Sequence, residues 1–515
     1  MTSLLLGIDL GTGSSKGVLT TPDGQIVATA VRPRPRSMSM PVPGWAEVDA
    51  EGVWWEDVVA LVRELLPQAD GADIAALCVS GVGPCLVLTD DAGRPVRPSI
   101  LYGIDSRAIA EIAELDERLG DAAVLERCGT PLTTQAVGPK ALWVQRREPE
   151  AWQRATRWFN SSSFVAFRLT GEYVLDHHTA SQCVPLYDIE ANTWFDPWYD
   201  DVMGPIARPR LVWPAEIVGS MTRRAAEETG LPAHTPVCAG TVDAWAEAFS
   251  GGVRSPGDLM LMYGSTMFFV QELTALARHP QLWNTMGIDP GSKCLAAGMS
   301  TSGSLTGWVQ GLVGDVPFEE LVEEAFSVPP GSDGLLVLPY FSGERTPIFD
   351  HRARGVIAGL NLRHQRGHVF RAVYEGIAFG IRQILELLDT EANPVKRIVA
   401  VGGGTQGRLW TQVVSDVTGR KQEIPEHTIG ASYGDALMAA IGCGLVPPQT
   451  NWARVAHIVE PNPASRPLYD EMFELYTSLY PATREHAHAL ARIQEEGLLS
   501  VSPVEGDGGP VRHRR

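Results

Sequence analysis

The chain has 515 residues, of which 44% are hydrophobic and 20% charged; these proportions are typical of a globular protein with a large core, and the length predicts two or three domains. Its formal net charge of -19 at pH 7 argues against a nucleic acid or an anionic membrane as partner, because both require a basic surface. No apolar run approaches the roughly 20 residues of a membrane span, and the chain enters a strand pattern with no preceding basic segment or cleavage site, so we expect no signal peptide.

The first predicted element is a β-hairpin. An apolar strand over residues 4–8 ends in Asp9, and a glycine-rich turn leads to a second strand over residues 17–20. Gly11 and Gly13 allow the backbone N–H groups of this turn to approach an anion closely and tolerate positive φ angles. Successive N–H groups in such a turn form a concave phosphate site. Asp9, at the end of the strand, could hold a hydrated Mg²⁺ beside the phosphates.

The side chains of the same turn add further groups that attract phosphate. Thr12, Ser14 and Ser15 contribute hydroxyl donors, and Lys16 contributes a positive charge. A P-loop requires a lysine followed by Ser or Thr and a helix. Here Gly17 and a strand pattern follow Lys16, which excludes a P-loop. An ordinary hairpin with a glycine turn remains the alternative.

A third strand over residues 26–30 and a surface loop over residues 32–44 come next. Trp45 follows this loop, where an aromatic side chain can line a pocket. The next pattern predicts a helix over residues 50–66, with Asp49 as its N-cap. We expect the two tryptophans of this helix to pack in the core.

Residues 74–80 have the pattern of a buried strand, which a glycine pair interrupts. Gly83 belongs to this pair, and glycines within a sheet often mark the close approach of a ligand. A loop with Asp105 and Arg107 follows, and a helix is expected from residue 108 onward. These two charged side chains could hydrogen-bond a polyol; a helix N-cap beside a surface arginine is the alternative.

Residues 108–230 are predicted to be mainly helical. His177 and His178 have no metal-ligand spacing near them, so we expect them on the surface or in a loop. A strand over residues 236–238, a glycine turn and a helix then follow, with Asp243 at the start of the helix. Sheets of α/β proteins place their active residues at the carboxyl ends of strands. A simple helix cap is the alternative for this aspartate.

The second half of the chain repeats the scheme of the first hairpin. A strand over residues 258–263 leads through Gly264, Ser265 and Thr266 to a returning strand over residues 267–270. The pattern is again an apolar strand, a turn rich in hydroxyl groups and a second strand. We therefore expect two related α/β domains, each of which presents one phosphate hairpin to a shared cleft.

A later strand over residues 399–401 ends in a glycine loop before a helix over residues 409–418. The loop contains Gly403, Gly404 and Gly407. It exposes backbone N–H groups at the start of a helix and admits phosphates or a flat ring against the backbone. We expect it to contact a nucleotide.

The most specific motif follows the second hairpin. Two segments fit the C-terminal signature of the FGGY carbohydrate kinases at every constrained position. They are residues 355–360 and, after a spacer of seven residues, residues 368–375. The other signature of that family is looser: Lys140 and Trp143 are in place, but Val137 stands where a small hydroxyl residue is expected. From the first hairpin to about residue 495, the order of motifs resembles this family, within the sugar kinase/Hsp70/actin superfamily. It is most similar to xylulose kinases.

The resemblance implies an α/β fold of two ribonuclease-H-like (actin-like ATPase) domains with a central cleft. Residues 1–250 would carry the sugar site, the first phosphate hairpin and the general base, and residues 251–497 the adenine side of the nucleotide. Residues 498–515, rich in glycine, proline and charge, are expected to be a disordered tail. The resemblance implies ATP and Mg²⁺ as cofactors and a small-molecule sugar or polyol as partner, with no nucleic acid and no membrane, and it allows a homodimer.

The resemblance also carries roles to matching residues. Asp243 corresponds to the general base, and Asp9 and Asp243 to the catalytic and metal-binding carboxylates. The nucleotide-binding residues are then Gly11, Thr12, Gly13, Lys16, Gly264, Ser265, Thr266, Gly303, Gly403, Gly404 and Gly407. The substrate-binding residues are Gly83, Asp105, Arg107, Trp45, Tyr102 and Asp243.

Three departures from xylulose kinases concern the sugar pocket. Val82-Gly83-Pro84 stands where they have Gln-Met-His, and Tyr102 is one residue farther from the following acid than their tryptophan is. Ala244 follows the base where asparagine is common. We therefore expect D-xylulose to be at best a moderate substrate and another ketose or a linear polyol to react better.

Together these patterns predict an ATP-dependent carbohydrate kinase, because phosphoryl transfer needs positioning, Mg²⁺ and an acceptor for the hydroxyl proton. A non-catalytic nucleotide switch of the Hsp70/actin kind is the alternative, and a phosphatase of the same superfamily is a weaker one. Asp243 and the pair Asp105 and Arg107 argue against a switch, which needs no sugar site. The seven cysteines are odd in number and form no Cys-x-x-Cys pair, which predicts reduced thiols and a cytoplasmic location.

Overall fold

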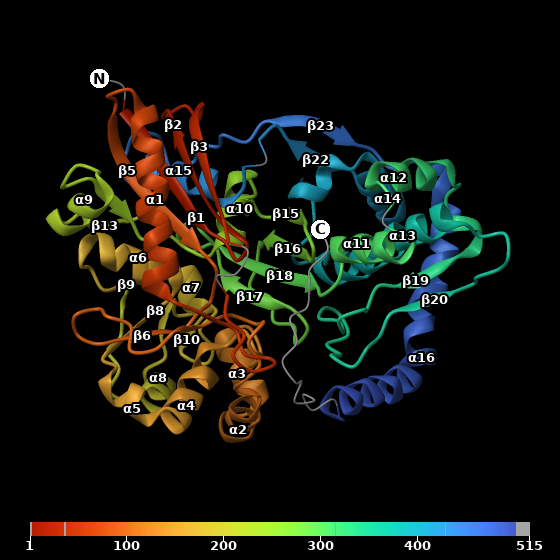
Figure 1. The fold of residues 1–515 in the computed structure, drawn as a ribbon, viewed down its shortest axis with the longest axis horizontal. Helices are drawn as coiled ribbons and strands as arrows, with labels where there is room; N and C mark the ends of the chain where they lie inside the picture. Colours follow the sequence, from red (N-terminus) through yellow and green to blue (C-terminus); the bar gives the residue numbers. More distant parts are fainter. Residues whose placement is uncertain (1–2, 35–37, 315, 428, 501–515) are drawn as a thin grey trace, which may run out of the picture.

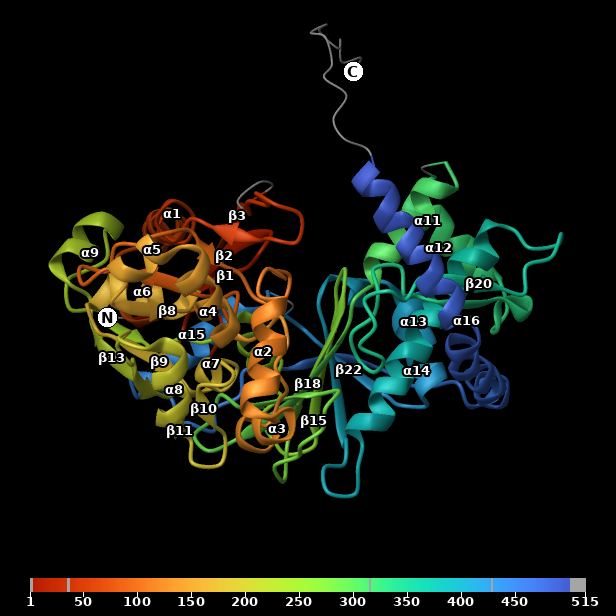
Figure 2. The same cartoon turned by 90° about the horizontal axis from the view of Figure 1, so that it is seen from below.

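The computed structural model describes residues 3–34, 38–314, 316–427 and 429–500. They form two lobes, each built on one large β-sheet with helices against it (Figures 1 and 2). We call the lobe whose sheet begins at Ser3 the first lobe and the other the second lobe. The mixed α/β class with two sheet-rich halves agrees with the prediction.

Six strands form the sheet of the first lobe. In spatial order they are β13 (Ile217–Ser220), β14 (Pro236–Cys238), β5 (Asp73–Gly81), β1 (Ser3–Leu10), β2 (Ser14–Thr20) and β3 (Ile26–Pro33). β1 and β2 form the predicted antiparallel hairpin, with Asp9 opposite Lys16. On its other side β1 runs parallel to β5, so that Asp9 lies beside Ser80 near the carboxyl ends of both strands.

Helices cover both faces of this sheet, which explains why β1 is a continuous apolar run rather than an alternating one. They are η1 (Ala50–Trp55), α1 (Glu56–Leu65), η2 (Leu66–Ala69), α6 (Ser161–Thr170), α9 (Arg223–Thr229), α10 (Asp243–Ser250) and α15 (Ala431–Gly442). The first three make up the predicted helix over residues 50–66. The Asp49 side chain caps its start by accepting the N–H of Glu51, and Trp54 and Trp55 are buried, as predicted.

α15 comes from the C-terminal half of the chain and packs on the sheet of the first lobe (Figure 1). Gly7 on β1 has no room for a side chain, since a Cβ there would lie 2.0 Å from the carbonyl oxygen of Ser432. The Ser80 hydroxyl donates to the carboxylate of Asp435 at 2.6 Å. A helix formed far along the chain therefore completes the first lobe.

The predicted helical segment forms the lower part of the first lobe in Figure 1, around an apolar core of its own. Its helices are α2 (Ile109–Leu119), α3 (Asp121–Cys128), α4 (Val137–Arg147), α5 (Pro149–Arg154), α7 (His177–Ser181) and α8 (Asp196–Met203). Short strand pairs complete this region: β4 (Glu47–Val48) with β7 (Ser99–Ile100), β6 (Val87–Thr89) with β8 (Arg157–Phe159), β9 (Val174–Asp176) with β12 (Arg210–Val212), and β10 (Tyr187–Asp188) with β11 (Thr193–Trp194).

Seven strands form the sheet of the second lobe. In spatial order they are β17 (Trp283–Met286), β18 (Lys293–Met299), β16 (Met267–Glu272), β15 (Asp258–Tyr263), β21 (Arg397–Val401), β22 (Gln422–Pro425) and β23 (Val455–Val459). β15 is antiparallel to β16 and parallel to β21, just as β1 is antiparallel to β2 and parallel to β5. The predicted repeat of the hairpin scheme is therefore confirmed.

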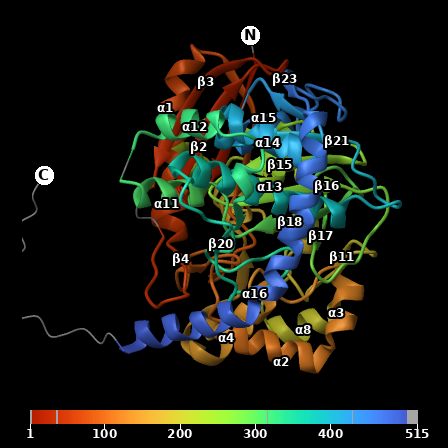
Figure 3. The same ribbon diagram turned by 90° about the vertical axis from the view of Figure 1, so that its right-hand side faces the viewer.

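The second lobe is completed by helices and one short strand pair, β19 (Leu336–Leu338) with β20 (Val356–Ala358) (Figure 3). The helices are α11 (Gly303–Leu312), α12 (Phe318–Ser327), η3 (Ser332–Gly334), α13 (Arg366–Leu388), η4 (Gly403–Gln406), α14 (Arg408–Thr418), η5 (Pro463–Ser465) and α16 (Arg466–Ser500). The predicted tail, 498–515, begins within α16, and its residues 501–515 lie outside the described ones. Among the described residues, none of the helices combines the length and the apolar character that crossing a membrane requires.

Candidate active site

A cavity of about 250 Å³ is lined by residues from both lobes. Five predicted site residues line it: Asp9, Gly83, Tyr102, Asp243 and Thr266. The first four belong to the first lobe, and Thr266 comes from the second hairpin. The fold thus brings both predicted hairpins and the predicted base to one place.

Three carboxylates converge on this cavity. Asp9 ends β1, and Asp243 and Glu247 lie one turn apart on α10. Burial raises the pKa of Asp9 well above its usual value, and the charge of Asp243 raises it further, while Lys16 lowers it. Burial also raises the pKa of Asp243 to about 6 and that of Glu247 to about 7. A carboxylate with a pKa near neutrality is suited to accept a proton from a hydroxyl group.

Glu247 was not predicted as a site residue. Its spacing of four residues from Asp243 puts both carboxylates on one face of α10. This spacing is the signal in the sequence that could have found it.

The two glycines predicted at the tip of the first hairpin differ in the space around them. Neither Gly11 nor Gly13 adopts a positive φ angle. A Cβ on Gly11 would lie 2.9 Å from the carbonyl oxygen of Ser14, whereas one on Gly13 would meet no atom within 4 Å. Space, rather than φ, therefore requires glycine at position 11. The Thr12 hydroxyl lies 3.1 Å from that of Tyr102, so the tip contacts the loop after β7.

The turns predicted to contact the nucleotide follow the carboxyl ends of two neighbouring central strands of the second sheet, β15 and β21. The Gly264–Thr266 turn follows β15, and the N–H of Gly303 at the start of α11 donates to the carbonyl of Gly264 at 3.0 Å. The glycine loop follows β21, the parallel neighbour of β15, with Met262 opposite Val401. Its predicted residues are Gly403 and Gly404 in η4 and Gly407 at the N-cap of α14.

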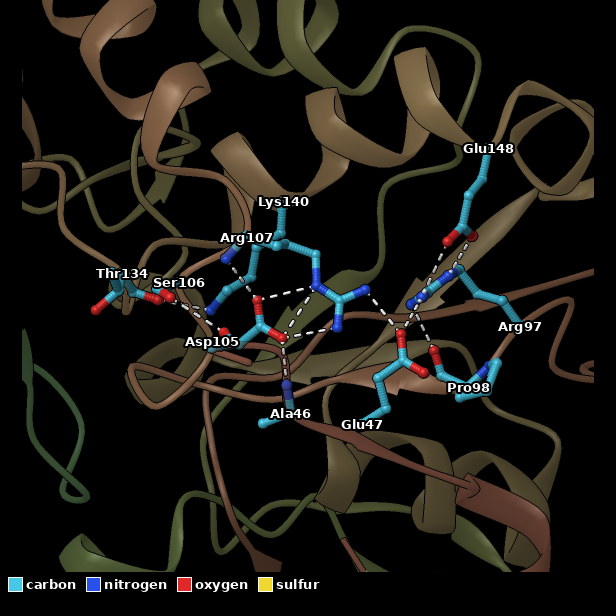
Figure 4. A network of polar contacts seen from close by, with 11 residues as sticks. Ala46, Glu47, Arg97, Pro98, Asp105, Ser106, Arg107, Thr134, Lys140 and Glu148 are labelled. Carbon is cyan, nitrogen blue, oxygen red and sulfur yellow. Dashed lines mark hydrogen bonds and ion pairs between the residues drawn. The ribbon is translucent and has the colours of Figure 1, made fainter. Parts of the chain in front are cut away.

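Asp105, Arg107 and Trp45, three predicted sugar ligands, are not among the residues that line the cavity. Asp105 and Arg107 belong to a buried polar network instead (Figure 4), and the half-buried Trp45 packs against Arg107. Asp105 Oδ2 accepts hydrogen bonds from Arg107 Nη2 at 2.7 Å and from the backbone N–H of Ala46 at 2.6 Å. Arg107 Nη1 donates to Glu47 Oε1 at 2.7 Å, and the guanidinium lies 4.3 Å from the centre of the Trp45 ring. The predicted direct contacts with a sugar do not fit this arrangement, because partners within the fold already engage these groups.

The same network fixes the loop that carries Tyr102 into the cavity. Gln135 Oε1 accepts the N–H of Gly103 at 2.8 Å, and the Thr134 hydroxyl donates to the carbonyl of Gly103 at 2.9 Å. The buried Lys140 in turn donates to the carbonyl of Thr134 at 2.7 Å. Gln135 also lines the cavity, and the bond to Gly103 leaves its amide nitrogen for a ligand.

The prediction for His178 was wrong: this residue is fully buried in α7. Its Nδ1 lies 2.6 Å from the carbonyl oxygen of Met286 in the second lobe, and its Nε2 lies 2.6 Å from the amide nitrogen of Gln182. Burial lowers the pKa of His178 to about 3, so the ring is neutral. It therefore donates from Nδ1 and accepts at Nε2. Gln182 lines the cavity, and the ring of His178 lies 4.1 Å from that of Trp245, which lines it too.

The N-terminal and C-terminal halves match two descriptions of one protein family. The FGGY family of carbohydrate kinases, N-terminal domain, matches residues 4–250, and the C-terminal domain of the same family matches residues 259–443. The chain belongs to the FGGY family of carbohydrate kinases. The alternative of a nucleotide switch is not favoured, and this FGGY kinase is an enzyme that uses ATP to phosphorylate a sugar or polyol hydroxyl.

Relatives of this FGGY kinase cover nearly its whole length. It is 30% identical to the xylulose kinase of Lactococcus lactis over 509 residues, which are 96% of this chain and 99% of that one. It is 27% identical to the L-xylulose/3-keto-L-gulonate kinase of Escherichia coli over 516 residues, 97% and 100% of the two chains. The crystal structure of xylulose kinase from Rhodospirillum rubrum matches with a TM-score of 0.86 and 31% identity, and covers 94% of this chain and all of that one, 100%.

Proposed function

We propose that this kinase phosphorylates a small sugar or polyol held in the cavity between the lobes, with Asp243 as the general base. The position of Asp243 at the start of α10, half-buried in the cavity that Asp9 also lines and with a pKa raised to about 6, carries this proposal. As the substrate hydroxyl attacks the γ-phosphorus of ATP, its proton passes to the Asp243 carboxylate. The new O–P bond forms while the bond from phosphorus to the leaving ADP oxygen breaks.

We propose that both hairpins and the glycine loop hold the nucleotide. The closely spaced turns at the ends of β15 and β21 support this proposal, and so does the cavity that Asp9 of the first hairpin and Thr266 of the second line together. The residues involved are Gly11, Thr12, Gly13, Lys16, Gly264, Ser265, Thr266, Gly303, Gly403, Gly404 and Gly407. Backbone N–H groups of such turns bind phosphates without a basic surface.

Mg²⁺ fits the carboxylate end of the cavity. Asp9 Oδ1 is buried and has no hydrogen-bond partner among the described residues, and Asp243 lies beside it. Among those residues no group of three acidic, histidine or cysteine side chains could hold an ion alone, so nucleotide phosphates and water would supply the other ligands. When bound, the ion would neutralise phosphate charge, while Asp9 and Asp243 would hold it.

The lining of the pocket bears on which sugar the kinase binds. Two relatives that are similarly identical to this chain are named for different substrates. One is named for xylulose and the other for L-xylulose and 3-keto-L-gulonate. At Gly83 the wall of the pocket is backbone, and Gln135 and Gln182 supply amides instead. We propose a substrate other than D-xylulose, and a positioning role for the network of Asp105 and Arg107.

We make three further proposals, on domain closure, cellular location and partners. We propose that residues 1–250, joined by α15, and the remainder of residues 251–497 act as two domains that close on their ligands. We also propose that the enzyme works in the cytoplasm and that it forms no complex with nucleic acid or membrane. The seven free thiols are consistent with a reducing compartment. Light scattering during size exclusion would distinguish a homodimer from a monomer.

A coupled assay of ADP release tests the proposed function. Pentuloses, hexuloses, pentitols and tetritols are each added to the wild type and to Asp243→Asn. Release that depends on one of these compounds and falls sharply in the variant supports the proposal. Release of ADP that no sugar or polyol stimulates contradicts it.

A further inference from the structure

One arginine of the cavity has no carboxylate partner. Arg345, in the loop between β19 and β20, lines the cavity together with Tyr102 and Gln135. Its Nη2 donates to the carbonyl of Met299 at 2.8 Å. Among the described residues no carboxylate oxygen lies within 4.0 Å of its guanidinium, and its Nε and Nη1 donate to no atom of that part of the chain.

The carboxylate of the adjacent Glu344 is engaged by backbone N–H groups and forms no ion pair with the guanidinium of Arg345. Glu344 Oε1 accepts the backbone N–H groups of Ser300 at 2.6 Å and of Arg345 at 2.7 Å. Burial raises the pKa of Glu344 to about 7, so this carboxyl is partly protonated at neutral pH. Burial also lowers the pKa of Arg345, but a guanidinium stays charged in proteins. Among the described residues, the guanidinium of Arg345 therefore has no ion-pair partner.

The guanidinium is held in place by its surroundings. It lies 5.9 Å from the centre of the Trp283 ring. It also lies against Gly298 on β18, where a Cβ would be only 3.2 Å from its central carbon. A second cavity, of about 400 Å³, shares Arg345, Tyr102 and Gln135 with the first, so the charge faces both spaces. A preorganised donor of this kind loses little entropy when it binds a ligand.

Arg345 lies away from the reacting end of the cavity. The second cavity, which Arg345 lines together with Tyr102 and Gln135, has none of the three carboxylates among the described residues of its wall. Those carboxylates, Asp9, Asp243 and Glu247, line the first cavity only. Phosphoryl transfer takes place beside the carboxylates under the proposed function, so Arg345 would meet the far end of the substrate and not the transferred group.

We propose that the preferred substrate is a sugar acid whose carboxylate pairs with Arg345 while a hydroxyl at its other end faces Asp243. This inference rests on the proposed function and names the class of its substrate. Arginine and a carboxylate form two parallel charge-assisted hydrogen bonds. A neutral sugar would leave the half-buried guanidinium without such a partner, which costs binding energy.

Matched pairs of compounds test this inference. D-gluconate is compared with D-glucitol, and D-xylonate with xylitol, because each pair differs only in a carboxylate against a hydroxymethyl group. We expect kcat/KM of the wild type to favour each acid by at least about tenfold. Arg345→Gln should lower it about 10²-fold for the acids, mainly through KM, and leave the alcohols within about threefold. Arg345→Lys, which keeps the charge without the planar fork, should lie between the two.

Controls separate this effect from changes in charge or folding. Arg352→Gln removes one charge from the exposed side of the same loop, where Arg352 pairs with Glu495, and should change neither class of substrate. Thermal melting shows whether the Arg345→Gln protein is folded. If it is not, Arg345→Lys takes its place in the test, and the expected result is a partial loss of kcat/KM for the acids. A preference of the wild type for the alcohols, or an equal loss for both classes in the variants, overturns the inference.

Calorimetry without ATP distinguishes failure of this inference from failure of the proposed function. Binding of the acids that Arg345→Gln abolishes, without any phosphorylation, supports the anionic subsite and contradicts the kinase mechanism. Turnover of neutral sugars with no binding of the acids supports the kinase mechanism and contradicts the subsite.

Discussion

The amide nitrogen of Gln182 lies 2.6 Å from Nε2 of His178, and this contact orients a side chain of the cavity from inside the fold. Because the amide donates to the ring, Gln182 presents its oxygen to a ligand as an acceptor. His178 is anchored at its other nitrogen by the carbonyl of Met286, on a strand of the second lobe. One short chain of hydrogen bonds thus joins the second sheet to the wall of the cavity.

Replacement of His178 by phenylalanine keeps an aromatic ring beside Trp245 but removes both hydrogen bonds. We expect KM for the sugar to rise about tenfold, the effect of one misplaced hydrogen bond, with KM for ATP unchanged. Steady-state kinetics measures both. Gln182→Ala should raise KM for the sugar similarly, and the double variant should lose little more, because the two residues act in series. Independent, additive losses would contradict this role.

Asp243→Asn should keep the affinity for ATP and lower kcat by about 10²–10⁴, the usual contribution of a general base. The amide is nearly isosteric and can still accept the N–H of Ala244, as the Asp243 carboxylate does at 2.8 Å. Rapid-quench measurement of a single turnover isolates the chemical step. A variant with nearly normal kcat on its best sugar would assign the base elsewhere.

The two glycines of the first hairpin give a matched pair of variants. Gly13→Val adds a side chain where the free protein has open space, so stability should be unchanged and only the affinity for an unreactive ATP analogue should fall. Gly11→Val should also lower the melting temperature, because a Cβ there meets the Ser14 carbonyl at 2.9 Å. Calorimetric titration measures the affinity. Unchanged nucleotide binding by a folded Gly13→Val protein would remove this tip from the site.

Glu247 should make the ligand-free protein less stable as pH rises. Its pKa is about 7 in the folded protein, against a usual value of 4.5, so between these values the folded state binds more protons than the unfolded one. Its contribution is complete below pH 4.5 and is lost as pH rises through 7, a change on the order of 3 kcal/mol. Glu247→Gln should therefore stabilise the protein more at pH 8 than at pH 5. Denaturant unfolding at both pH values measures this difference.

The exposed Glu64 serves as the control for that experiment. Glu64→Gln, measured at pH 5 and pH 8, shows what the same substitution does on the exposed face of α1. A change in stability in Glu247→Gln that is equal at both pH values would show that Glu247 does not titrate as described.

Asp105→Ala should mainly lower the stability of the folded protein. It leaves the guanidinium of Arg107, whose side chain is 0% exposed, without one of its two carboxylate partners, and breaking a buried ion pair in this way costs about 3–5 kcal/mol. Asp90→Ala removes the partner of Arg94, whose side chain is 79% exposed, and should cost about 1 kcal/mol or less. Chemical unfolding compares the two variants. In the folded fraction of Asp105→Ala, KM for the sugar should rise more than KM for ATP, because the loop of Tyr102 loses its support.

Local patterns were enough to predict both hairpins, the glycine loop and the position of Asp243. Each depends on neighbouring residues: apolar runs define the strands, and glycine and hydroxyl residues define the turns. The direction of a side chain depends on packing between distant segments. Asp105 and Arg107 were therefore identified as a charged pair, yet the sequence could not show that they face Glu47 and Ala46 rather than a ligand.

Other residues of the site come from loops that carry no motif. Gln135, Gln182 and Arg345 belong to three separate loops, and only the folded chain brings them to one cavity. His178 gave no signal because its partners, a backbone carbonyl and an amide, impose no spacing on the sequence. In contrast, the spacing of Asp243 and Glu247 was visible and could have been used.

A ribosome that has completed residues 1–250 has made every strand of the first sheet but not α15, the helix that covers β1. Residues 431–442 follow only after some 180 further residues. At about 5–20 residues per second, one apolar face of the sheet stays open for on the order of 10 s or longer. The first half of the chain therefore cannot finish folding as it is made, and during translation it presents the surface that chaperones bind until the second half returns to close it.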